Sequence, residues 1–257
     1  MFDEKQIKEL LSGNRAASNK RVIQTDEPTP YEEDKLKKKQ MLVRDSFEMV
    51  GKYNMPLIKK QNIDLDKIEP WSYVKTKQND VDNKHKTIHF FTYDWLFETV
   101  YNKPEEALEK LDQYYALLTP DFSMYFDMPR ALQIYSTFKN RWCGAFWQKQ
   151  GMRVIPTVAC SDEASYDFCF DGIEVGSVVA VTTYARRKEF KKEFLRNYDK
   201  MLEVLKPSAI VCYGEAFDEM RGNIRAYSAF NHEELIAKLG LSEYTRKRLN
   251  GELYPSN

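Results

Sequence analysis

Five short apolar runs alternate with amphipathic stretches over residues 87–217. The runs read TIHFFTYD from Thr87, YYALLTPD from Tyr114, MRVIPTVAC from Met152, SVVAVTTYA from Ser177 and SAIVCYGEAFD from Ser208. They are nearly continuously apolar and rich in β-branched and aromatic residues, which is typical of strands buried on both faces. Because such strands occur in parallel sheets, the runs predict five parallel strands.

The stretches between the runs carry the apolar periodicity of helices. Residues 95–113 predict two helical pieces that restart at Pro104, since proline is favoured at the first helical position. Pro129 opens a long amphipathic helix, and residues 161–172 predict a short one. Another well-patterned helix ends before Pro207.

Strands that alternate with helices predict the α/β class, with a mostly parallel sheet of about five strands and covering helices. We expect an open, doubly wound sheet. A partial or irregular barrel is the alternative, in which the N-terminal segment or IRAYSAF, residues 224–230, adds strands to the ring. A closed barrel needs eight strands, and the sequence does not clearly contain them.

The composition of the chain changes along its length and predicts three segments. These are a helical and extended N-terminal arm (1–80), the α/β core (81–230) and a C-terminal helical tail (231–257). Within the arm, residues 54–75 are short apolar clusters broken by Pro56 and Pro70, which suits a segment laid over the core.

Charge and hydropathy exclude some classes of protein. Lys and Arg number 39 and balance 39 Asp and Glu, so the formal net charge is zero. A protein that coats duplex DNA would carry a basic excess, although a local basic groove remains compatible with this balance. No apolar run reaches the roughly 18 residues of a membrane span, and the first residues lack the apolar core of a signal peptide.

The cysteines indicate the compartment. Cys143, Cys160, Cys169 and Cys212 show no CxxC spacing, and most lie in apolar contexts where cysteine acts as a small buried hydrophobe. We therefore expect a reduced, cytoplasmic protein without structural disulfides.

Polar residues follow every predicted strand, at the edge where parallel sheets bind their ligands. They are Tyr93 and Asp94; Asp121 and Ser123; Thr157, Ser161 and Asp162; Thr182 and Thr183; and Tyr213 and Glu215. Together they predict a ligand-binding crevice. The same residue types cap helices and close turns, so a structural role for each one stays open.

Two carboxylates are the candidate catalytic groups. Asp121 directly follows Pro120 at a strand end and could serve as a general base, a metal ligand or a hydrogen-bond acceptor. Asp162 follows the next strand and also suits a helix cap. Asp127 lies just before Pro129 and is expected to cap the long helix.

Further ligand contacts are expected from that helix and from a basic run. Asn140, Arg141, Trp147 and Gln148 mix hydrogen-bonding groups with a ring that can stack on a base, although core packing is the alternative. Arg186 and Arg187 precede a helix, where backbone N–H groups favour phosphate; a solvated charge run is the alternative there.

Several familiar sites are missing from the sequence. There is no GxGxxG, GxxxxGK[ST] or GxSxG motif. His85 and His89 run into a strand, where extended chain separates them by about 13 Å, too far to share a metal. We expect no metal site, and the sequence identifies no cofactor.

Residues 86–214 resemble an uncharacterised domain family found in phages, plasmids and integrative elements of bacteria. The pieces that carry the resemblance are IHFFTYD, LLTPDFSMYFDMP, NRWCGAFWQ, VIPTVAC, YDFCFDGIEVGSVVAVTT and AIVCYG. Family members often have Trp at the position of Cys160. The resemblance implies a mobile-element protein that works on DNA, nucleotides or host defence, and it names no catalytic residue.

Three functional hypotheses follow. The first is a protein that binds, or also processes, a nucleotide or nucleic acid in the crevice at the strand ends. The second is a non-catalytic protein that binds a host protein through its charged N-terminal arm. The third and weakest is a glycosidase- or transglycosylase-like barrel enzyme. The sequence does not indicate an oligomeric state.

Overall fold

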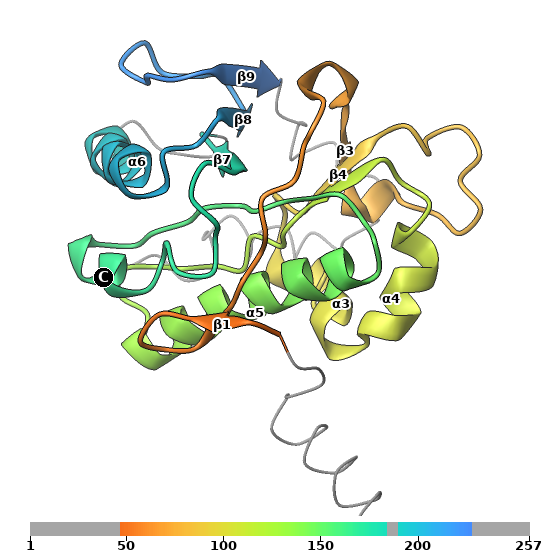
Figure 1. Cartoon of the computed structure of the whole chain (residues 1–257), viewed down its shortest axis with the longest axis horizontal. Helices are drawn as coiled ribbons and strands as arrows, with labels where there is room; N and C mark the ends of the chain where they lie inside the picture. The colour runs from red at the N-terminus through yellow and green to blue at the C-terminus, as the bar shows by residue number, and fades with distance from the viewer. Residues whose placement is uncertain (1–46, 184–189, 228–257) are drawn as a thin grey trace, which may run out of the picture. The chain divides into compact units, whose positions relative to one another are not determined.

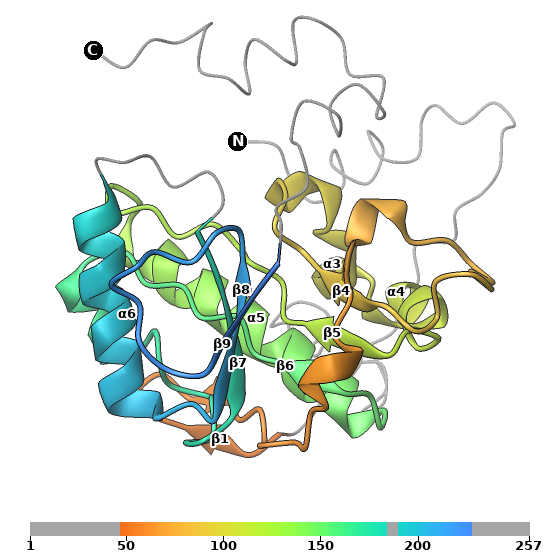
Figure 2. The same ribbon diagram turned by 90° about the horizontal axis from the view of Figure 1, so that it is seen from above.

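Parallel strands follow one another in chain order through this protein. The computed structural model describes residues 47–183 and 190–227. Within them seven strands run parallel: β3 (Pro70–Ser72), β4 (Thr87–His89), β5 (Ala116–Leu118), β6 (Val154–Ile155), β7 (Val178–Thr182), β8 (Ala209–Tyr213) and β9 (Ile224–Tyr227). Figure 1 and Figure 2 show their arrangement.

The strands form two hydrogen-bonded sheets, ordered β3-β4-β5-β6 and β7-β8-β9. The chain just after β6 joins them, because Thr157 makes a parallel bridge to Ala180 of β7. The Ala180 N–H donates to the carbonyl oxygen of Pro156, and the Val158 N–H donates to that of Ala180, each at 2.8 Å. The spatial order of the strands therefore equals their order in the sequence.

Helices connect the strands as the sequence predicted. They are η3 (Asp94–Leu96), α3 (Thr99–Asn102), α4 (Pro104–Leu111), α5 (Arg130–Lys149), η4 (Glu163–Asp167) and α6 (Lys191–Leu205). Two further 3-10 turns, η1 (Leu65–Lys67) and η2 (Tyr73–Lys75), flank β3. Both views place α6 beside β7 and β8. The prediction of an α/β protein with parallel strands and covering helices is confirmed.

Alternate residues of β7 and β8 face two different cores. Val178, Ala180, Ala209 and Val211 pack with side chains of β5, β6 and the η1 region. Val179, Val181, Ile210 and Cys212 pack against Tyr198, Met201 and Leu205 of α6. The first core contains no residue of α3 to α6, so the helices cover one face of the strands and the opposite face is filled by the strands' own side chains.

This arrangement distinguishes the two architectures considered above. A doubly wound sheet reverses its strand order at a switch point and carries helices on both faces. Here the order never reverses, and the ring centroid of Tyr213 of β8 lies 4.3 Å from that of His89 of β4 across the inner face. The strands therefore form a partial, irregular barrel, and no closed barrel is found among the described residues.

Two strands lie outside the five predicted ones. Residues 54–75 were expected to pack over the core or, in the barrel alternative, to add strands; Pro70–Ser72 form β3 and pair with β4. Its first residue is a proline, which an edge strand tolerates, and three residues are too few for a periodic pattern. Ile224–Tyr227 of the IRAYSAF segment form β9, as the barrel alternative expected. Met49–Val50 (β1) and Met55–Pro56 (β2) form a separate antiparallel pair.

Gly144 lets α5 approach the strands closely. A Cβ at this position would lie 2.5 Å from Cδ1 of Ile58 and 2.8 Å from Cγ2 of Thr119. Real Cβ atoms do not approach other heavy atoms this closely, so a larger residue would push the helix outward. The close approach brings the polar face of α5 against the ends of β5 and β6.

One prediction about the cysteines was wrong. Cys160 and Cys169 form a disulfide with a Cα–Cα distance of 5.6 Å, whereas Cys143 and Cys212 are free and buried. The two bonded residues are nine positions apart, and only the folding back of the loop between them brings their sulfurs together. Spacing alone did not reveal that contact.

Several predictions fall on residues that the structure does not describe. These are the first 46 residues of the N-terminal arm, Arg186, Arg187 and the tail at residues 231–257. Among the described residues, no helix is long and apolar enough to cross a membrane.

Candidate functional site

A pocket lies at the carboxyl ends of β6 and β7. Its volume is about 260 Å³, and its walls come from the loop after β5, the chain after β6, the end of β7 and the first turns of α6. The aromatic lining residues are Tyr125, Phe126, Phe190, Phe194 and Tyr198; the polar ones are Ser161, Thr182, Glu193 and Asn197. Carboxyl ends of parallel strands are where α/β proteins bind ligands.

Two aromatic rings stand exposed at the edge of this pocket. Tyr125 and Phe126 are 60% and 63% exposed. The side-chain amide of Gln133, which is buried in α5, donates to the carbonyl oxygens of Tyr125 at 3.0 Å and Met128 at 2.8 Å. The loop backbone is thus anchored to α5, and the rings project from a fixed support.

Gln133 also joins this loop to the chain after β6. Its Oε1 accepts hydrogen bonds from the Ser161 hydroxyl at 2.5 Å and from Nη1 of Arg130 at 2.7 Å. Because one buried amide forms hydrogen bonds with both loops, it fixes the positions of the two pocket walls relative to each other.

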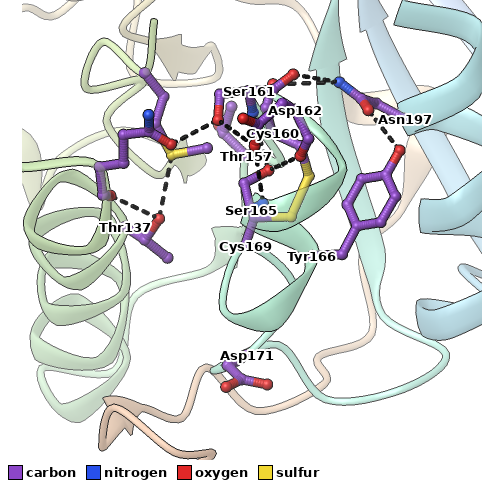
Figure 3. The surroundings of a disulfide bond; sticks show 12 residues. Thr137, Thr157, Cys160, Ser161, Asp162, Ser165, Tyr166, Cys169, Asp171 and Asn197 are labelled. Atoms are coloured by element: carbon purple, nitrogen blue, oxygen red, sulfur yellow. Dashed lines mark hydrogen bonds between the residues drawn. A yellow bond between two sulfur atoms is a disulfide. The ribbon is translucent and has the colours of Figure 1, made fainter. Parts of the chain in front are cut away.

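Asn197 of α6 anchors the opposite wall (Figure 3). Its Nδ2 donates to the carbonyl oxygens of Cys160 at 3.4 Å and Ser161 at 3.1 Å. Its Oδ1 accepts from the hydroxyl of Tyr166 at 2.6 Å. Partial burial raises the pKa of Tyr166, so that hydroxyl keeps its proton at neutral pH. The amide therefore connects α6, η4 and the end of β6.

Asp162, a candidate catalytic residue, is held by the protein itself. Both carboxylate oxygens accept from Nη2 of Arg130 at 3.0 Å, and Oδ1 caps η4 by accepting from the Ser165 N–H at 3.1 Å. Burial acts to raise the pKa of this carboxyl, but the hydrogen bond and charge of Arg130 outweigh it and lower the pKa. Asp162 thus occupies the helix-cap role that the sequence left open.

A second group of predicted residues gathers at the ends of β4 and β5. Asp94 accepts from the Ser123 N–H at 3.0 Å and from its hydroxyl at 2.9 Å, which ties the two strand ends together. Tyr93 stacks on the exposed Trp95 with ring centroids 6.4 Å apart. This group adds a second aromatic surface at the same edge of the sheet.

Asp121 is partly buried in the loop between the two groups. It borders a small cavity that Asn140, Arg141 and Thr157 also line. Asp121 therefore lies beside polar side chains at the strand ends, while its neighbours Met124 and Tyr125 reach the larger pocket.

Asn140 and Arg141 direct their polar atoms at groups of the protein itself. Nδ2 of Asn140 donates to the carbonyl oxygen of Pro120 at 2.8 Å. Arg141 donates from Nε to the carbonyl oxygen of Asp171 at 2.8 Å and from Nη2 to that of Cys169 at 2.6 Å. Complete burial lowers the pKa of Arg141 to about 9, so it remains charged at neutral pH. These groups organise the strand ends.

Trp147 and Gln148 lie at the other end of α5. A helix rises about 1.5 Å per residue, which puts Trp147 about 25 Å from Arg130 along the axis. The Trp147 ring is buried and stacks on Phe90, and Gln148 brackets the backbone N–H and carbonyl of Lys59 at 2.8 and 2.7 Å. The structure does not bring these two residues to the pocket.

The remaining predicted residues, at the ends of β7 and β8, also divide between the pocket and other parts of the protein. Thr182 lines the pocket, and its hydroxyl donates to the carbonyl oxygen of Tyr213 at 3.0 Å. The Tyr213 ring is buried inside the partial barrel, where it packs against His89 and Phe91. Glu215 is exposed, and its carbonyl oxygen accepts from the hydroxyl of Thr183 at 2.7 Å.

Sequence reasoning missed several pocket residues. Tyr125 and Phe126 lie in SMYFDMP, where attention to the carboxylates obscured two aromatic residues in a polar connection. Glu193 and Asn197 occur four residues apart on α6, which puts both on one helix face. The aromatic pair was the signal that could have been found.

The fold and the site thus define an α/β protein with a partial parallel barrel and an aromatic pocket at its strand ends. Residues 47–231 match the family described as Domain of unknown function (DUF4417), and the chain belongs to this family. The match confirms the phage-associated resemblance and extends beyond residues 86–214 at both ends. No solved structure matches the chain.

Two relatives come from bacteriophages. The chain is 33% identical to the Gene 1 protein of Mycobacterium phage L5 over 175 residues, which are 67% of this chain and 76% of that protein. It is 40% identical to the Gene 1 protein of Mycobacterium phage D29 over 129 residues, which are 49% of this chain and 48% of that protein. The family is therefore represented in phages.

Proposed function

We propose that this protein binds a nucleic-acid base, in a nucleotide or a single strand, in the pocket at the carboxyl ends of β6 and β7. The observation that carries the proposal is the exposed aromatic pair Tyr125 and Phe126 on its anchored loop. Exposed rings on a fixed support are costly in water and useful where a flat ligand stacks.

The remaining pocket walls suit a base better than a phosphate. Among the described residues that line the pocket there is no Lys or Arg, and Glu193 is the charged one. Glu193 accepts from Nη2 of Arg196 at 3.3 Å. The hydroxyls of Ser161 and Thr182 supply polar contacts beside apolar and aromatic surface, the combination found in small-ligand sites.

Phosphate contacts are assigned to the basic run after β7. Arg186 and Arg187 fall in the sequence between Thr182 and Phe190, which both line the pocket. In this proposal they contact the backbone of the ligand while the rings contact its base. Binding should then weaken as salt increases, because each neutralised phosphate releases counterions.

The test is fluorescence anisotropy of a labelled oligothymidylate titrated with Tyr125→Ala and Phe126→Ala variants. A lost base stack costs about 1–3 kcal/mol, so each variant should bind roughly 5- to 150-fold more weakly. Leu132→Ala is the matched control, since Leu132 is an exposed apolar residue of α5 that does not line the pocket. Wild-type affinity in both ring variants, or no binding by the wild type, would contradict the proposal.

Processing of the ligand is a separate proposal, and it rests on Asp121. If Asp121 acts as a base, Asp121→Asn should abolish turnover of a bound oligonucleotide while affinity and melting temperature stay close to those of the wild type. Strong unfolding of this variant would assign Asp121 to the turn instead, and unchanged turnover would exclude it as the base.

A further inference from the structure

The disulfide lies in the wall of the pocket and presents its two sulfurs differently. Cys160 lines the pocket and is partly exposed, whereas Cys169 is completely buried in the core beneath α6. A reagent that enters the pocket therefore meets the sulfur of Cys160 first. Cys143 and Cys212 are free and buried.

We propose that the Cys160–Cys169 pair is a reversible thiol–disulfide site that reacts with small thiols through the pocket, at Cys160. The thiolate of a small thiol attacks Sγ of Cys160 and breaks the S–S bond. A mixed disulfide forms on Cys160, and Cys169 leaves as a thiolate that takes up a proton. A second thiol displaces the adduct as a small-molecule disulfide, so both cysteines end as thiols.

A positive charge lies beside the backbone of the residue that carries the leaving sulfur. Nη2 of Arg141 donates to the carbonyl oxygen of Cys169 at 2.6 Å, so the guanidinium lies near this residue deep in the protein. A neighbouring cation stabilises a thiolate and makes it a better leaving group. This contact favours attack at Cys160 with departure of Cys169.

The loop between the cysteines is held by contacts other than the disulfide (Figure 3). The Ser165 hydroxyl donates to the carbonyl oxygen of Asp162 at 2.6 Å, and the Ser161 N–H donates to that hydroxyl oxygen at 3.1 Å. Outside the loop, Asn197 contacts the Cys160 carbonyl. Both thiols should remain close enough to bond again after reduction, which makes the reaction reversible.

Glu193 suggests the charge of the thiol. Among the described residues that line the pocket it is the charged one, so a cationic thiol is favoured over an anionic one. We use cysteamine and its disulfide, cystamine, as the probe pair. The inference does not depend on what else the pocket binds.

The experiment incubates the folded full-length protein with cysteamine–cystamine mixtures, quenches in acid and locates adducts by peptide mass spectrometry. Cleavage at Asp162, Glu163 and Asp167 separates Cys160 from Cys169. We expect at least about tenfold more adduct on Cys160 than on Cys169, and none on Cys143 or Cys212. Return to cystamine should restore the bond.

Two single variants provide the matched comparison. Cys169→Ala should leave a Cys160 thiol that iodoacetamide labels in the folded protein, whereas Cys160→Ala should leave a Cys169 thiol that it labels at least about tenfold more slowly. Equal labelling of the two thiols, or adducts first on Cys169, would overturn the inference. So would a wild-type protein that carries four free thiols after treatment with cystamine.

Discussion

At the scale of single residues, Arg141 shows how a charge can organise a core. Its side chain is almost completely buried and donates to the backbone carbonyls of Cys169 and Asp171. When a buried acceptor loses its hydrogen-bond donor, the free-energy cost of removing that acceptor from water is no longer offset. Arg141 therefore fixes the backbone of the segment that follows η4.

Replacement of this charge should destabilise the protein strongly. Arg141→Met fills a similar volume but leaves those carbonyl oxygens without their donor, so we expect the free energy of unfolding to fall by about 3–5 kcal/mol. The control is Arg196→Met, which removes an exposed arginine paired with Glu163 and Glu193 and should cost less than about 1 kcal/mol. Chemical denaturation measures both, and equal effects would contradict this role.

The buried side chain of His89 leads to a second prediction, which concerns the pH dependence of stability. Burial, followed by the charge of Lys75, lowers the pKa of His89 to about 3, while an unfolded histidine titrates near 6.5. Between these values the unfolded chain binds more protons, so stability falls as pH drops below about 6.5. The slope is roughly 1.4 kcal/mol per pH unit.

His89→Phe should remove this component of acid sensitivity, because Phe fits among the rings of Phe91 and Tyr213 and has no titratable group. Denaturation at several pH values between 6.5 and 4 should show a shallower decline than in the wild type. His85→Gln is the control, since His85 is exposed and should leave the slope nearly unchanged. A decline as steep in His89→Phe as in the wild type would refute the assignment.

At the scale of elements, α5 acts as the support on which the pocket loops rest. Gln133, near its first turn, bonds to the loop after β5 and to Ser161 after β6. Gln148, near its last turn, bonds to the backbone of Lys59 in the same manner. The same residue type therefore anchors two different segments at the two ends of one helix.

This symmetry allows a controlled experiment. Gln133→Ala should release the Tyr125–Met128 segment and speed hydrogen exchange of its amides. Oligothymidylate binding should weaken by roughly 3- to 10-fold, which corresponds to the net free energy of about one hydrogen bond that orders the loop. Gln148→Ala should speed exchange near Lys59 and leave binding unchanged. If both variants bind as the wild type does, the anchored loop is not part of the site.

At the scale of the whole molecule, the elements predicted from the sequence are those whose burial requires an apolar sequence pattern. The runs that contain β4 to β8 are nearly continuously apolar because both faces of these strands are covered, so their existence and order could be predicted. β3 is three residues long and begins with Pro70, so it has no such signature. The alternation of strands and helices predicts parallel pairing, but it does not say whether the strand order reverses.

The site was readable only in part for a related reason. Strand-end position draws attention to Asp94, Ser123 and Thr182, because connectivity alone fixes which end of a strand a residue follows. Whether a polar side chain faces a ligand or a backbone carbonyl depends on tertiary contacts, as Asn140 and Arg141 show. The disulfide and the anchored aromatic loop likewise arise from chain segments that meet only after folding.

The most direct test of the proposed function is photocrosslinking with an oligonucleotide that carries 4-thiothymidine, followed by peptide mapping. The thiobase crosslinks to side chains that it touches, so it reports the position of the base itself. We predict crosslinks in the peptides that contain Tyr125 and Phe126 and in the first turns of α6, and their loss in the Phe126→Ala variant. Crosslinks confined to other surfaces, or none at saturating oligonucleotide, would contradict a base-binding pocket at the ends of β6 and β7.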